Sequence, residues 1–83
     1  MKTANRILLC IFNYRQEHDF PPTVREIGDL VGLSSTSTVW AHLDRLRKRE
    51  LITYLEKKPR TIKVTEKGHK VVHELLNKKM LLQ

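Results

Sequence analysis

Apolar residues recur at helical spacing near the start of the chain. Within residues 4–18, Ile7, Ile11 and Tyr14 lie at positions i, i+4 and i+7, and polar residues dominate the second half of the segment. This spacing predicts a helix rather than a strand. A Pro-Pro pair at 21–22 is expected to end the helix, because proline disfavours helical backbone at the residue before it.

A second, short helix is predicted after this pair. Thr23 and Glu26 have the spacing of a capping box, in which the hydroxyl and the carboxylate each accept a hydrogen bond from a backbone N–H at the helix start. The helix therefore begins at about Val24. It stops at Gly32, the residue type best suited to the left-handed conformation after a helix. The side chains expected to face inward are Ile27, Leu30 and Val31.

A third helix is predicted from about Ser35 to Glu50, because its apolar residues form one narrow stripe. The stripe consists of Val39, Leu43 and Leu46. When residues are placed at intervals of about 100°, the opposite face is small at its start and basic towards its end. That face holds Ser37, Ala41, Asp44, Arg45 and Lys48, with Thr38 and Trp40 on its flanks.

The pattern changes to a period of two at Leu51, which predicts strands. The alternating residues are Leu51, Thr53 and Leu55 against Ile52, Tyr54 and Glu56, followed later by Ile62 and Val64. Between the two arms lie the basic residues 57–60, so we expect a β-hairpin with a basic tip. Thr65 then caps a last helix, and Gly68 is expected to weaken its first turn because glycine has a low helix propensity.

These elements follow one another in the order of a helix-turn-helix with a wing. The predicted fold class is α+β: a winged helix-turn-helix with a three-helix core, a two-stranded β-hairpin wing and an extra C-terminal helix. Residues 1–65 are expected to form this domain, and residues 66–83 the additional helix.

The charge of the chain favours a polyanionic partner. Sixteen Lys and Arg against nine Asp and Glu give a net charge of +7 on 83 residues. Nucleic acid is the leading class of partner, an anionic membrane surface is the second, and a merely solvated surface is the alternative. A chain of this length forms one small core, which leaves little room for a large enzyme pocket.

The single cysteine, Cys10, lies in an apolar run at residues 7–12. One cysteine cannot form an intramolecular disulfide, so a reducing compartment is the simpler expectation. The run is shorter than a signal-peptide core or a membrane span. We therefore expect a cytoplasmic protein.

The third helix begins with a run of hydroxyl side chains from Ser34 to Thr38. One of Ser34, Ser35 and Thr36 is expected to cap the helix. A run that continues through Ser37 exceeds what capping requires. Short side chains that both donate and accept hydrogen bonds can approach base edges closely, and a threonine methyl can contact a thymine methyl.

The segment PPTVREIGDLVGLSSTSTVWAHLDRLRKRELI resembles the DNA-binding domain of LexA-type repressors. Members share a Pro-Pro pair followed by Ser/Thr-x-R-E-I-G, V-G-L-x-S-x-S-T-V and H-L-x-x-L motifs, and the likeness extends over residues 4–65. The resemblance implies a transcriptional repressor that binds double-stranded DNA through its third helix and is associated with a bacterial or phage nucleoid. Similar members typically read palindromic sites with GAAC-type halves.

The resemblance also implies the contact residues. The positions expected to face the major groove are Ser35, Ser37, Thr38, Trp40 and Ala41. The positions expected to contact the DNA backbone are Thr23, Arg25, Arg45, Lys57, Lys58 and Arg60. At Trp40 the family usually has a smaller or more polar residue, so the indole is expected to change the sequence preference. The alternative for Trp40 is a partly buried side chain packed against the wing.

LexA-type repressors continue into a second domain that supplies dimerisation and a Ser-Lys self-cleavage dyad, whereas 18 residues follow position 65 here. We therefore expect no self-cleavage and no enzymatic activity in this chain. The last helix instead resembles the helix after the wing in other small winged-helix repressors, which often pairs with its copy. The expected homodimer seam is Val72, Leu75, Leu76 and Met80, and packing on its own domain is the alternative.

No metal, cofactor or small-molecule substrate is predicted. His69 and His73 lie four residues apart, but a zinc site needs further ligands. The sequence has no glycine-rich phosphate loop and no nucleophile elbow. Nor does the last helix predict a membrane anchor, because Lys78 and Lys79 interrupt its apolar face. The rival prediction is a winged-helix protein-interaction module or a competitor of another repressor.

Overall fold

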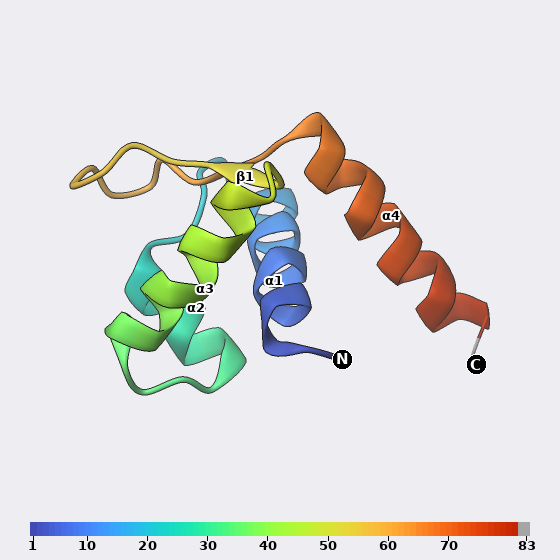
Figure 1. The fold of residues 1–83 in the computed structure, drawn as a ribbon, viewed down its shortest axis with the longest axis horizontal. Coiled ribbons are helices and arrows are strands. Elements are labelled where there is room, and N and C mark those ends of the chain that lie inside the picture. Colours follow the sequence, from blue (N-terminus) through green and yellow to red (C-terminus); the bar gives the residue numbers. More distant parts are fainter. Residues whose placement is uncertain (82–83) are drawn as a thin grey trace.

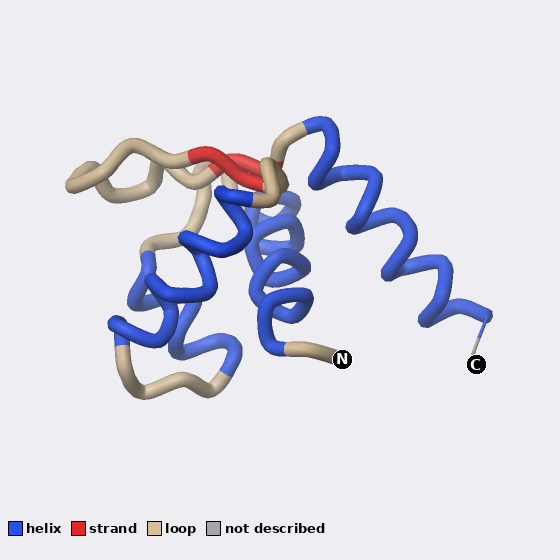
Figure 2. The backbone as a smooth tube through the Cα atoms, in the orientation of Figure 1, coloured by secondary structure: helices blue, strands red, loops and turns tan. Residues whose placement is uncertain are grey.

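The computed structural model describes the backbone of residues 1–81 and the side chains of residues 1–78. Its elements are α1 (Thr3–Glu17), α2 (Val24–Val31), α3 (Thr36–Lys48), β1 (Ile52–Thr53), β2 (Lys63–Val64) and α4 (Glu66–Leu81). The two strands pair antiparallel, with Ile52 opposite Val64. This arrangement confirms the predicted α+β winged-helix fold (Figures 1 and 2).

One hydrophobic core holds the helices and the base of the wing together. Helices α1, α2 and α3 pack on one another, while β1 and β2 lie across their ends and α4 descends on the far side of α1 from α3 (Figure 1). The fully buried side chains include the three predicted stripe residues of α3. The core consists of Ile7, Leu8, Ile11, Ile27, Val31, Val39, Leu43, Leu46, Leu51, Ile52, Ile62 and Val72.

Helix α2 has the predicted caps at both ends. The Thr23 hydroxyl accepts from the Glu26 backbone N–H, the Glu26 carboxylate accepts from the Thr23 N–H, and Gly32 follows the helix in the left-handed conformation at φ 80°. The inward placement of Leu30 was wrong, because its side chain is 62% exposed. A helix of two turns buries one narrow side, here Ile27 and Val31, and Leu30 lies beside it.

The wing, residues 52–64, has a shorter ladder than its alternating pattern predicts. Each strand contains two residues, and the arms then separate into a loop. The Thr61 hydroxyl closes this loop by accepting from the Leu55 N–H at 3.0 Å, and its one proton lies within reach of the Lys58 and Leu55 carbonyl oxygens at 3.0 and 3.3 Å. Lys57 and Arg60 take left-handed backbone conformations at φ 62° and 58°. Side-chain bonds and turns therefore shape most of the wing.

Helix α4 begins at the end of the wing and is held there by its first turn. The Thr65 hydroxyl accepts from the Gly68 N–H at 2.9 Å, and Thr65 also donates to the Glu50 carbonyl oxygen. The description of Gly68 as a weak point was wrong. A Cβ atom at this position would overlap the Leu51 carbonyl oxygen and lie 2.8 Å from a Val64 methyl. Glycine is required there by packing.

Candidate nucleic-acid interface

The outer face of α3 presents small side chains to solvent. Ser35 is the N-cap, because its hydroxyl accepts from the Thr38 N–H at 3.4 Å, so the helix itself begins at Thr36. Ser37, Thr38 and Ala41 are all exposed. Since Val39 and Leu43 fix the opposite side in the core, this face is held outward as a rigid surface. Its small residues allow a second molecule to approach the helix backbone closely.

Trp40 joins this face to the wing. Its ring centroid lies 5.4 Å from that of Tyr54, at an interplanar angle of 57°, and the residue is 41% exposed. The Arg47 guanidinium lies 4.6 Å from the centroid of the Tyr54 ring and forms ion pairs with Asp44 at 2.9 Å and Glu56 at 3.4 Å. Trp40 therefore packs partly on the base of the wing while one part of the indole stays open to solvent.

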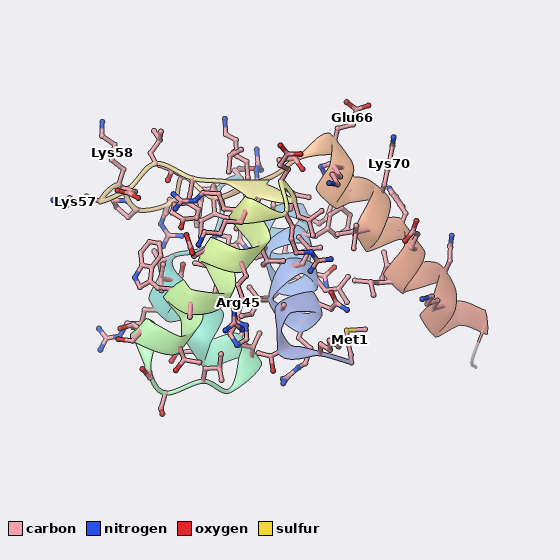
Figure 3. The ribbon with its side chains drawn as sticks, in the orientation of Figure 1. Met1, Arg45, Lys57, Lys58, Glu66 and Lys70 are labelled. Carbon is pink, nitrogen blue, oxygen red and sulfur yellow. The ribbon has the colours of Figure 1, made fainter. Side chains whose placement is uncertain are left out.

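A hollow of about 370 Å³ separates α3 from the wing. Its apolar lining includes Pro22, Val24, Trp40, Tyr54, Leu55, Pro59 and Ile62. Lys57, Lys58 and Arg25 also border it, and Figure 3 shows the two lysines at the far tip of the wing, pointing away from the body. The hollow is thus largely apolar inside, with exposed cations at its border.

The remaining predicted backbone contacts differ in how free their side chains are. Arg45 and Arg25 are exposed, on α3 and at the start of α2 respectively. The Thr23 side chain is half-buried and its hydroxyl caps α2. The Arg60 side chain is 38% exposed, but its guanidinium is bound to the protein, because it donates to the Glu26 carboxylate at 2.9 and 3.2 Å. Only some of these groups therefore point freely into solvent.

Comparison with known proteins agrees with this geometry. A family model described as the LexA DNA binding domain matches residues 2–61. The chain belongs to this family. The LexA repressor of Oenococcus oeni is 56% identical over 62 residues, which cover 75% of this chain and 29% of that protein. The LexA repressor of Ligilactobacillus salivarius is 47% identical over 77 residues, covering 93% of this chain and 37% of that protein.

This LexA-family chain thus spans about a third of the length of these curated relatives. The resemblance inferred from the sequence motifs is confirmed. Helix α4 lies entirely beyond the residues matched by the family model. Among residues 1–78, no helix is long and apolar enough to cross a membrane, and no three metal-binding side chains come together.

Part of the dimer seam predicted on α4 packs against the LexA-family domain of the same chain. Val72 is fully buried in the core, which corrects its assignment as a free contact residue. Leu75 and Leu76 are half-buried. Met80 lies outside the side chains that the structure describes. His69 and His73 meet the edge of the Phe12 ring at centroid distances of 5.7 and 6.5 Å.

Sequence reasoning missed the side chains that brace the wing of this LexA-family domain. Tyr54 and Arg47 hold its outgoing arm to α3, while Phe20 and Tyr14 help to hold its returning arm. A weak signal was available, because Tyr54 follows the basic end of α3 closely in the sequence and a guanidinium over a tyrosine ring is a favourable contact. The contacts of Phe20 depend on the tertiary fold and leave no local pattern.

Protonation of Glu26 should destabilise the domain in acid. Its pKa is lowered to about 2, first by the Thr23 backbone N–H and then by the Arg60 guanidinium. Because the folded pKa is depressed, this contribution is complete above the unfolded pKa of about 4.3 and is lost as pH falls towards 2. In thermal unfolding followed by circular dichroism, the difference in Tm between the wild type and Glu26→Gln should therefore shrink over this range. A constant difference would contradict the assignment.

Proposed function

We propose that this LexA-family domain is a transcriptional repressor that binds double-stranded DNA sequence-specifically, with α3 in the major groove. The observation that carries the proposal is the exposed, small-residue face of α3 beside a wing whose tip carries Lys57 and Lys58. A helix fits the major groove, where each base pair shows a distinct pattern of donors and acceptors. The names of the relatives, LexA repressor, support the same class of function.

The first two turns of α3 would make the contacts with the DNA bases. The Ser37 and Thr38 hydroxyls can donate to or accept from base edges, and the Ala41 methyl can contact a thymine methyl. Ser35 would contribute while capping the helix, and the exposed part of Trp40 would meet the flank of the same site. We propose palindromic half-sites as the target, because a twofold protein reads a twofold site.

Affinity would come mainly from cations on the phosphates. Arg25, Arg45, Lys57 and Lys58 are exposed, and the two lysines project from the wing tip, away from the body of the protein (Figure 3). Each phosphate neutralised should contribute about −0.9 to the slope of log K against log salt concentration. Lys58→Ala should reduce the steepness of that slope by about 0.9 per protomer and should weaken binding to operator and random duplex alike. Fluorescence anisotropy titrations at several salt concentrations measure this; a complex insensitive to salt contradicts the mechanism.

We further propose that the domain forms a homodimer through α4. Leu75 borders the same surface groove as Met1 and Leu30, which are 67% and 62% exposed. Burying such side chains against a second copy would remove apolar surface from water. Sedimentation at micromolar concentration should show a dimer that Leu75→Asp loses. A wild type that sediments as a monomer leaves α4 as a packing element of its own domain.

A further inference from the structure

We propose that Arg60 is a positioning residue that fixes the wing against α2, and that its contribution to DNA binding comes from this attachment and not from a phosphate contact. The proposal rests on the proposed DNA-binding function. The family resemblance implied that Arg60 contacts the DNA backbone, and the proposal replaces that role.

The guanidinium of Arg60 has partners in α1, in α2 and in the loop between them, although the side chain is still 38% exposed. It donates to both carboxylate oxygens of Glu26 at 2.9 and 3.2 Å and to the Pro21 carbonyl oxygen at 3.1 Å. It also lies 4.5 Å from the centroid of the Phe20 ring. Tyr14 completes the cluster by donating to the same carboxylate at 3.1 Å. A planar fork that binds a carboxylate with two bonds and covers an aromatic ring is held in one orientation.

The wing needs such an attachment because its own ladder is short. Two residue pairs join β1 to β2, and within the wing the loop beyond them is closed by the hydroxyl of Thr61. The outgoing arm is fastened to α3 through Tyr54, between Trp40 and Arg47. The returning arm is fastened to α2 through Arg60. Together the two attachments fix the position from which Lys57 and Lys58 can reach a DNA strand.

The side chain, and not the backbone, distinguishes Arg60 from its neighbour Lys57. Both residues have left-handed backbone conformations, at φ 58° and 62°. The Arg60 guanidinium is bound on the α2 side of the wing, whereas Lys57 and Lys58 extend from the tip (Figure 3).

The substitution Glu26→Gln distinguishes the two possible roles of Arg60, because they predict different changes in DNA affinity. Glutamine keeps the capping box, because its amide oxygen can still accept from the Thr23 N–H, but it removes the charge that holds Arg60. If Arg60 binds phosphate, removing the carboxylate frees it and leaves DNA affinity equal or higher. If Arg60 positions the wing, the same substitution weakens DNA binding, because the freed wing must be ordered on binding.

The experiment measures DNA affinity against salt for the wild type, Arg60→Ala, Glu26→Gln, the double variant and Lys58→Ala. We expect Arg60→Ala and Glu26→Gln each to weaken binding about fivefold, and the double variant to bind no more weakly than either single variant. Their salt slopes should equal that of the wild type, whereas Lys58→Ala should lower the slope by about 0.9. Arg60→Lys should not restore affinity, because an ammonium cannot form the fork; as a point charge it would suffice for a phosphate.

A second measurement uses the free protein. The amide protons of Leu55 and Lys58 should exchange with solvent at least about threefold faster in Arg60→Ala and in Glu26→Gln than in the wild type, because a released wing opens more often. Unchanged exchange overturns the proposal. The proposal is also overturned if Glu26→Gln binds DNA more tightly than the wild type and Arg60→Ala changes the slope of log K against log salt concentration. If the wild type shows no salt-dependent DNA binding, the proposed function fails, while the exchange rates still decide the role of Arg60.

Discussion

Replacing Gly68 with alanine should destabilise the domain by about 3 kcal/mol. Helix propensity alone predicts the opposite, because alanine is better than glycine inside a helix by about 1 kcal/mol. The free-energy cost of the steric overlap is larger than this gain in helix propensity. A Cβ atom at position 68 would overlap the Leu51 carbonyl oxygen and press on Val64, so α4 must move away from the base of the wing. The Leu51 carbonyl oxygen belongs to the backbone, which cannot move aside as a flexible side chain can.

Chemical denaturation of Gly68→Ala and of Lys70→Ala measures this effect. Lys70 is exposed on the same helix, so its replacement by alanine tests propensity without the overlap. A loss of about 3 kcal/mol corresponds to a fall in Tm of roughly 12–24 °C for a domain of this size. An unchanged or higher Tm in Gly68→Ala would show that α4 does not dock closely on Leu51.

Replacing Ala41 with glutamate should weaken DNA binding roughly 100-fold, because a carboxylate would face bases and phosphates at the centre of the interface. The side chain is exposed on α3, so the fold should tolerate the change. Thermal unfolding should therefore leave Tm within a few degrees of the wild type. The loss of affinity should reflect the position of the charge and not its presence alone.

Asn77→Glu is the matched control, because it makes the same change in net charge at an exposed position of α4. Helix α4 lies on the far side of α1 from α3 (Figure 1), and Asn77 is not among the residues that line the groove of Leu30 and Leu75. Its substitution should change affinity only slightly. Equal losses in Asn77→Glu and Ala41→Glu would mean that net charge, and not the face of α3, controls binding.

The elements that the sequence predicted well are those with local signals. The capping box of Thr23 and Glu26 and the left-handed Gly32 needed only residues a few positions apart. The apolar stripe of α3 followed from the helical spacing of its apolar residues. Because Val39 in this stripe is buried, the opposite face of the helix was correctly placed towards solvent. The same reasoning failed for Leu30, since a helix of eight residues has too few turns to define the width of its buried side.

Other features could not be read from the sequence because they depend on contacts between distant segments. Arg60 belongs to a basic run, yet Glu26 binds it across 34 positions of the chain. Gly68 looked unfavourable because propensity describes an isolated helix and not the Leu51 carbonyl against which this helix packs. Trp40 was left between two roles, and the structure shows an indole that is part packed and part exposed.

Selection of bound duplexes from a random pool, carried out in parallel with the wild type and Thr38→Ala, tests most directly whether the exposed face of α3 reads DNA sequence. We expect the wild type to enrich one motif. The variant should lose information at a limited set of positions within that motif, because a missing base contact costs about 1–3 kcal/mol of discrimination there and leaves the phosphate contacts intact. A pool that shows no motif, or a motif that is identical for both proteins, would contradict the assignment of base reading to this face.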